Sequence, residues 1–142
     1  MPISYSGTSA HILRRRTLLG MIGRLHHLAI DCPEPLELAR FYSALLGKPI
    51  TYQSDDWVVV ADNDHTSGLG FQRAVDHRRP QWPDPERPQQ MHLDVMVDDV
   101  DAAGPEVLAL GARKLAGTVY EDPAGHPFCL IPRPGWAPPV NA

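Results

Sequence analysis

The chain repeats itself, and this internal duplication constrains its fold more than any other feature. Each half contains a histidine about 20 residues before the end of a Leu-Gly pair: His27 precedes the pair at 46–47, and His92 precedes the pair at 110–111. A proline-rich stretch over 80–88 separates the halves, and proline at this density disfavours helices and central strands. The repeat indicates one supersecondary unit used twice.

Within each half, the apolar residues follow the same succession of periods. The segments 25–30 and 92–97 show the alternation of apolar and polar residues that is typical of strands. A helical spacing of apolar residues follows in each half and ends at Gly47 or Gly111, where a C-terminal glycine is typical. Three short strands are then expected: 50–53, 57–61 and 69–73 in the first half, and near Lys114, near Val119 and over 128–131 in the second. Each half therefore predicts a β-α-β-β-β module.

One residue disturbs this pattern. Pro105 falls inside the second helix, where proline costs about 3 kcal/mol unless it lies in the first turn. We expect that helix to be kinked or to start late.

Neither half is long enough to bury both faces of a four-stranded sheet alone. Pairing the modules predicts an α+β fold: a curved mixed sheet with helices outside and a concave cup inside, where a ligand would bind. We expect one domain over 24–134, with module one over 24–75, a linker over 76–90 and module two over 91–134. Residues 1–23 are expected to be a disordered or non-native extension, and 135–142 a tail.

Composition excludes several classes of partner and compartment. The net charge of -4, with scattered acidic residues, does not indicate nucleic acid or an anionic membrane as a partner. No apolar run approaches the ~18 residues of a membrane helix. Cys32 and Cys129 are too few for a disulfide scaffold and indicate thiols in a reducing cytoplasm. The arginines at 14–16 resemble an export signal, but Arg24 interrupts the apolar region that such a signal needs.

Three motifs carry a resemblance to a known superfamily. They are Phe41-Tyr42 with Leu46-Gly47, the stretch Met91-His92-Leu93-Asp94-Val95, and the turn Asp122-Pro123-Ala124-Gly125-His126. In this order and spacing they resemble the vicinal-oxygen-chelate superfamily, which includes glyoxalase I, extradiol dioxygenases, methylmalonyl-CoA epimerase, and fosfomycin- and bleomycin-resistance proteins. The resemblance covers roughly Arg24 to Pro134.

The resemblance implies a metal site with one ligand from the first and last strand of each module. Carried onto this sequence, the ligands are His27, Gln72, His92 and Cys129, holding a divalent metal such as zinc, iron, nickel or manganese. The family usually has glutamate at the positions of Gln72 and Cys129. Glutamine has no basic site, whereas a thiolate suits zinc. The alternative is a pair of cavity histidines that hydrogen-bond to neighbours.

Further residues are candidates for the cup. Asp94 lies two residues from His92 and so on the same strand face, where it can be a general base, a third metal ligand or a buried carboxylate satisfied by local donors. Trp57, Phe71, Met96 and His126 are candidates for the substrate pocket, although core packing for the first two and an exposed turn for His126 are the alternatives. The basic cluster over 77–79 either attracts an anionic ligand or is a solvated loop.

Three functions follow from these candidates. The first is a metal-dependent lyase, isomerase or dioxygenase acting on an oxygen-rich small substrate. The second is metal-free binding or sequestration of a small molecule, as in the bleomycin-resistance branch of the superfamily. The third is an accessory domain that only dimerises. A homodimer is expected under all three, because open curved sheets of this family commonly pair edges across a two-fold axis.

Overall fold

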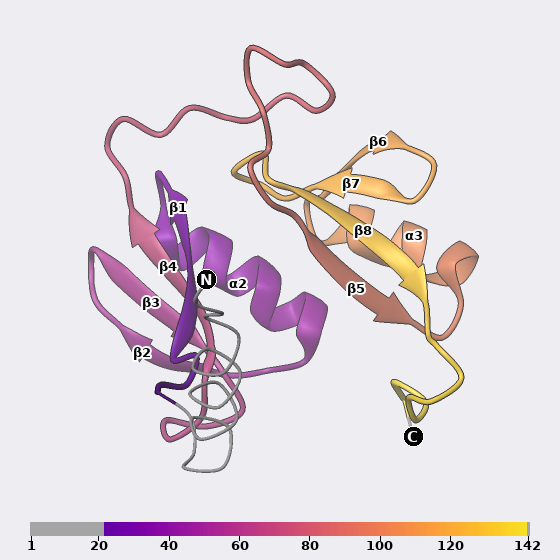
Figure 1. Ribbon diagram of the computed structural model, residues 1–142, viewed down its shortest axis with the longest axis horizontal. Helices are drawn as coiled ribbons and strands as arrows, with labels where there is room; N and C mark the ends of the chain where they lie inside the picture. Colours follow the sequence, from indigo (N-terminus) through magenta and orange to yellow (C-terminus); the bar gives the residue numbers. More distant parts are fainter. Residues whose placement is uncertain (1–21, 142) are drawn as a thin grey trace, which may run out of the picture.

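The computed structural model describes residues 22–141 and contains two consecutive βαβββ modules (Figure 1). Module one comprises β1 (His27–Cys32), α2 (Pro35–Leu46), β2 (Ile50–Gln53), β3 (Trp57–Val60) and β4 (Gly68–Arg73). Module two comprises β5 (Leu93–Val97), α3 (Val100–Ala109), β6 (Arg113–Ala116), β7 (Val119–Glu121) and β8 (Pro127–Pro132). The predicted α+β class is confirmed. Most of the predicted N-terminal extension lies outside the described residues.

Local chemistry explains where the helices begin and end. Pro35 opens α2, where its missing N–H and fixed φ are tolerated, and Gly47 closes the helix with a left-handed φ of 64°. The carboxylate of Asp99 caps α3 by accepting hydrogen bonds from the N–H groups of Asp101 and Ala102. Although Pro105 lies inside α3, the helix starts directly after this cap.

The strands form two four-stranded mixed sheets, ordered β1-β4-β3-β2 and β5-β8-β7-β6. In each sheet the first strand of the module runs parallel to the last. The sequence suggested one curved sheet, but within the described residues β1 and β5 remain at the edges of separate sheets. Both edges therefore keep unpaired backbone groups that another strand can satisfy.

Helix α2 lies between the two sheets, so the modules share one core (Figure 1). Tyr42 stacks on Phe71 of β4 with ring centroids 5.4 Å apart, and Phe41 contacts Phe128 of β8 at 5.8 Å. The Tyr42 hydroxyl donates to the carboxylate of Asp122 at 2.7 Å. Helix α3 packs on the same core, because its Gly104 lies against the hydroxyl of Tyr120, whose ring stacks on Phe128.

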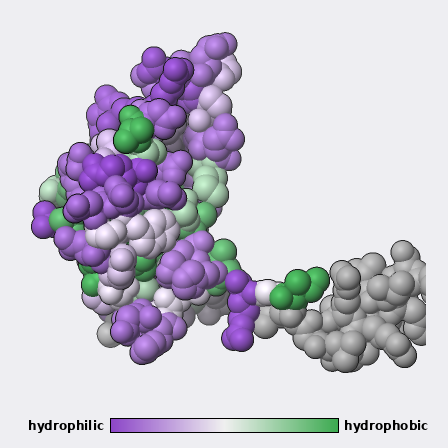
Figure 2. All heavy atoms as spheres, turned by 90° about the vertical axis from the view of Figure 1, so that its left-hand side faces the viewer, coloured by the Kyte–Doolittle hydropathy of each residue, from purple (hydrophilic) through white to green (hydrophobic). Residues whose placement is uncertain are grey.

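The other face of each sheet is directed away from this core. On β1, Ala29 and Asp31 are exposed while Ile30 and Cys32 are buried, as strand alternation requires. On β5, Asp94 and Met96 are exposed. We call these two surfaces the outer faces. The side of the molecule drawn in Figure 2 belongs to module one and mixes hydrophilic residues with scattered hydrophobic ones.

The segment from β4 to β5 arches above both modules and is pinned to module two (Figure 1). Nε2 of His77 lies 2.9 Å from the carbonyl oxygen of Ala124, and Arg79 donates to the carbonyl of Pro123 at 3.1 Å. The Arg79 side chain crosses Gly125, where a Cβ would lie only 2.1 Å from its Cγ. Glycine is needed there for this close approach and for its φ of 93°.

Among residues 22–141, no helix combines the length and hydrophobicity that crossing a membrane requires.

Candidate functional site

Three potential metal ligands converge on the outer face of module two: His92, Asp94 and Cys129. Their ligand atoms all lie within 4.8 Å of one another. The strand register explains this convergence, because Asp94 of β5 pairs with Cys129 of β8. His92 precedes β5 by one residue, and its Nε2 lies 3.2 Å from a carboxylate oxygen of Asp94. Within residues 22–141, no other three such side chains come equally close.

The trio is accessible to a small molecule, and its thiol is unreactive when free. The side chains of His92 and Asp94 are 41% and 54% exposed. Partial burial raises the pKa of the Cys129 thiol, and the charge of Asp94 and its hydrogen bond raise it further. The thiol therefore keeps its proton at neutral pH unless a bound cation replaces that proton.

The chemistry of this donor set fits zinc. Zinc accepts imidazole nitrogen, carboxylate oxygen and thiolate sulfur, and catalytic zinc sites keep three protein ligands and one open position. Magnesium prefers oxygen ligands and is a poorer match to a thiolate. The three residues can thus hold a metal without any contribution from module one.

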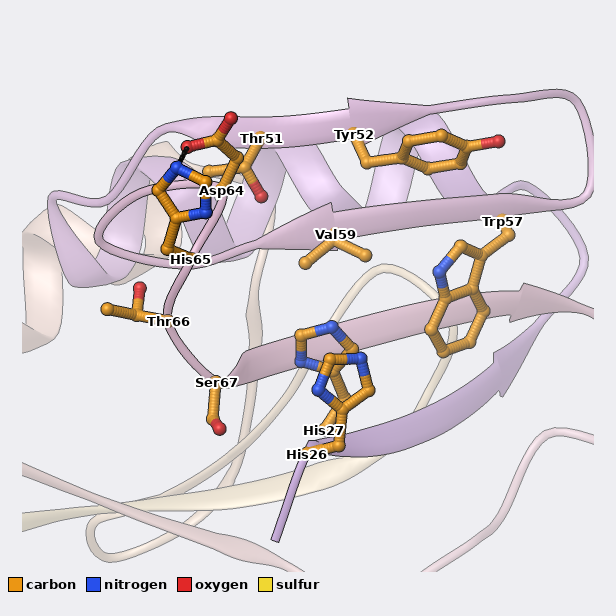
Figure 3. A pocket seen from close by; sticks show the side chains of 10 residues that line it. All are labelled: His26, His27, Thr51, Tyr52, Trp57, Val59, Asp64, His65, Thr66 and Ser67. Atoms are coloured by element: carbon orange, nitrogen blue, oxygen red, sulfur yellow. Dashed lines mark ion pairs between the residues drawn. The ribbon is translucent and has the colours of Figure 1, made fainter.

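A separate cavity of about 650 Å³ lies on module one, near the start of β1 (Figure 3). His27 lines it, and Nδ1 of this residue accepts a hydrogen bond from the N–H of Gly68 at 3.0 Å. Burial, and then the neighbouring His26, lowers the pKa of His27, so the ring is neutral at neutral pH. A neutral ring with Nδ1 as acceptor carries its proton on Nε2. His27 therefore presents a donor and offers no free lone pair to a metal.

The cavity also contains residues that the sequence analysis did not single out. The ring of His26 lies 3.8 Å from that of His27, Tyr52 extends from β2, and Asp64 pairs with His65 at 3.4 Å (Figure 3). His26 just precedes β1, so strand alternation does not control its direction. His26, Asp64 and His65 lie outside the strands, where periodicity carries no signal.

Module one lacks the donors that module two places opposite each other. Gly68, not Gln72, is the β4 partner of His27, and Gln72 pairs with Asp31 four residues further along, roughly 13 Å away. Ala29 lies two residues after His27, as Asp94 lies two residues after His92. The β4 partner of Ala29 is Gly70, whereas the β8 partner of Asp94 is Cys129. The indole of Trp57 covers this spot, since a Cβ at Gly70 would lie 2.0 Å from the ring. Module one thus offers an aromatic surface where module two offers donors.

The remaining predicted pocket residues have different surroundings. Trp57 lines the module-one cavity, and Met96 lies two residues from Asp94 on the outer face of module two. Phe71 is fully buried in the shared core against Tyr42. Nδ1 of His126 lies 2.9 Å from the carboxylate of Asp122, which also binds Tyr42. His126 thus belongs to the contact between the modules.

Both cysteines are free thiols. Cys32, the last residue of β1, is buried, and this burial, reinforced by the charge of Asp122, raises its pKa to about 12. It therefore packs as a small apolar side chain in the core.

The paired βαβββ modules with mixed four-stranded sheets define the vicinal-oxygen-chelate fold. The chain belongs to the glyoxalase-like domain family, whose model matches residues 27–131. A search of curated proteins found no match.

Solved structures support the same fold. A glyoxalase/bleomycin resistance protein/dioxygenase family enzyme from Burkholderia phytofirmans is similar with a TM-score of 0.59 and 16% identity, covering 76% of this chain and 97% of its own. The fosfomycin resistance protein FosX from Mesorhizobium loti gives 0.57 and 13%, covering 82% and 97%. The trypanothione-dependent glyoxalase I of Leishmania major gives 0.54 and 16%, covering 78% and 86%. At these identities the similarity establishes the fold alone.

Proposed function

We propose that this protein is a metal-dependent lyase, isomerase or dioxygenase acting on a small, oxygen-rich substrate. One observation carries the proposal: His92, Asp94 and Cys129 converge within 4.8 Å on an open sheet face. The similar structures include a glyoxalase I and an enzyme of a dioxygenase-containing family, so the fold supports such chemistry. The trio departs from the ligand set that the sequence suggested, because Asp94 joins it and His27 and Gln72 do not.

The three residues of the trio would have different roles at such a site. A bound metal would polarise a substrate oxygen and stabilise the negative charge that develops there. His92 and Cys129 would serve as ligands of such a metal. Asp94 accepts a hydrogen bond from the Cys129 thiol in the free protein and would supply a carboxylate oxygen as the third ligand. His27 acts differently: its Nε2–H is a hydrogen-bond donor for a substrate oxygen.

Metal analysis tests this proposal directly. Protein purified without a histidine tag and dialysed against zinc should retain a stoichiometric amount. His92→Ala and Cys129→Ser should each remove most of it, because each leaves only two ligands. His27→Ala should leave the content unchanged, since Nδ1 of His27 is occupied by Gly68.

Two outcomes would contradict the assignment: zinc that survives His92→Ala, or zinc that is lost equally with His27→Ala. His65→Ala serves as the control for removing an exposed histidine from a loop. If the native protein binds no metal at all, the aromatic surface formed by Trp57 favours the second function, metal-free binding of a planar compound. Thermal-shift screening with planar compounds would then follow.

The unpaired edge strands β1 and β5 support a homodimer in which each cup uses two chains. β1 carries His27 and β5 directly follows His92, yet both strands are sheet edges within the described residues. Pairing β1 of one copy with β5 of another satisfies the free backbone groups and joins the two sheets into one curved sheet. The aromatic surface of one copy then faces the donor trio of the other.

Sedimentation velocity over a wide concentration range tests this arrangement. We expect a dimer at all but the lowest concentrations, and Asp31→Lys together with Ala29→Pro on β1 should shift it to monomer. The same pair of changes on the opposite edge strand β2, at Thr51 and Gln53, is the matched control. A native monomer throughout, or equal effects of both pairs, would exclude pairing through β1.

A further inference from the structure

A second, smaller pocket of about 220 Å³ lies on module two, between the linker and strands β6 and β7. Its walls come from the linker residues Arg79, Pro80, Gln81 and Trp82 and from Arg113, Leu115 and Glu121. Two of its residues are cationic and one is anionic. The pocket is distinct from the cavity on module one, which no residue of module two lines.

The pocket belongs to the same outer face as the trio. Val119 of β7 pairs with Cys129, and Glu121 lies two residues further along the same strand face. Because Glu121 lies one strand away from Cys129 and two residues further along, their Cα atoms are roughly 8 Å apart. A small molecule can therefore contact both places at once.

Glu121 organises the charges of this pocket. It is only 2% exposed, and its Oε1 accepts from Nη2 of Arg79 at 2.9 Å and from Nε of Arg113 at 2.6 Å. One carboxylate between two guanidinium groups leaves an excess of one positive charge. The side chains of Arg79 and Arg113 are 45% and 72% exposed, so N–H donors remain available to solvent or a ligand.

The cationic wall is held in position. Arg79 is fixed by Glu121, by the carbonyl of Pro123 and by its passage over Gly125. A guanidinium fixed in this way has lost its side-chain entropy before a ligand arrives and matches an oxyanion with paired hydrogen bonds. The indole of Trp82 and the side chain of Leu115 add apolar surface beside it.

We propose that Arg79 and Arg113 form an oxyanion subsite, so that the ligand of this protein is a small molecule with a carboxylate or phosphate-type group joined to an apolar or aromatic body. This inference rests on the proposed function only in using the same face of module two. The anionic group lies between the two guanidinium groups, beside Trp82. The oxygen-rich part of the ligand extends along β7 and β8 to His92, Asp94 and Cys129.

Isothermal titration with three probes tests the subsite. In the native protein, stripped of metal with EDTA and then dialysed into chelator-free buffer, benzoate and phenylphosphonate should each bind about tenfold or more tightly than neutral benzamide, because a charge-assisted hydrogen bond is roughly twice as strong as a neutral one. The anion that binds more tightly shows whether the subsite prefers a carboxylate or a phosphate-type group. Arg113→Gln should abolish the preference for anions.

Lys114→Gln is the matched control. It removes the same charge from the next residue of β6, whose ammonium lies over the Tyr120 ring on the other strand face, and should preserve the preference. The proposal is overturned if neither anion binds, if benzamide binds equally, if the preference survives Arg113→Gln, or if both variants reduce it alike. Because the protein is metal-free in these titrations, the outcomes are independent of whether the trio binds zinc.

Discussion

Replacing Asp122 with alanine is expected to lower the free energy of unfolding by about 3–5 kcal/mol. The carboxylate is 1% exposed and accepts from the Tyr42 hydroxyl at 2.7 Å and from the N–H groups of Ala124 and His126 at 2.9 and 3.0 Å. Each buried donor without an acceptor costs about 1–3 kcal/mol, and relaxation of the turn recovers part of the sum. Urea unfolding followed by circular dichroism measures the change.

Asp62→Ala is the comparison for this variant. Asp62 pairs with Lys48 at 2.8 Å, but its side chain is 63% exposed, so its loss should cost less than about 1 kcal/mol. Equal effects of the two substitutions would mean that the contact between α2 and the 122–126 turn does not hold the modules together.

The protein is also expected to lose stability in alkali because of Tyr42. Burial, and then the adjacent charge of Asp122, raises the pKa of Tyr42 well above the usual value of 10.0. Above about pH 10 the unfolded chain releases this proton while the folded chain retains it, so each further pH unit lowers stability by about 1.4 kcal/mol. The stabilisation is complete below that pH and disappears as pH rises toward the folded pKa.

Tyr42→Phe should reduce the slope of stability against pH by one proton in this range, although it also removes the hydrogen bond to Asp122 at all pH values. Tyr52→Phe, at a residue that is 55% exposed, should leave the slope unchanged. Chemical unfolding at several pH values between neutrality and strong alkali gives both slopes. An unchanged slope in Tyr42→Phe would contradict the assignment.

Local signals in the sequence were sufficient to predict the order of elements. The alternation on β1 and β5, the helical spacing before Gly47 and the Asp99 cap depend on neighbours within a few residues. The strands after each helix fall close to the predicted positions for the same reason. The duplication then led to the fold, because two copies of one module have few ways to bury their apolar faces.

The details of the site depended on contacts that span the chain. The register of β1 with β4 puts Gly68 beside His27, and spacing along the sequence does not determine such a register. The acceptor role of the His27 ring follows from the same pairing. Trp57 covering Gly70 and Phe71 turning into the core are also tertiary features. His92, Asp94 and Cys129 were each identified because they lie near sequence motifs, but their grouping as a trio depends on the register of β5 with β8.

The position of α2 has a consequence for motion. Rotating one module against the other would separate Phe41 from Phe128 and break the hydrogen bond between Tyr42 and Asp122. A hinge through the middle of the chain is therefore costly, unlike in enzymes whose two lobes close over a ligand. Only the solvent-facing side chains are free to adjust around a ligand. Selectivity for the ligand therefore depends more on the preformed shape of the site than on closure of the two modules.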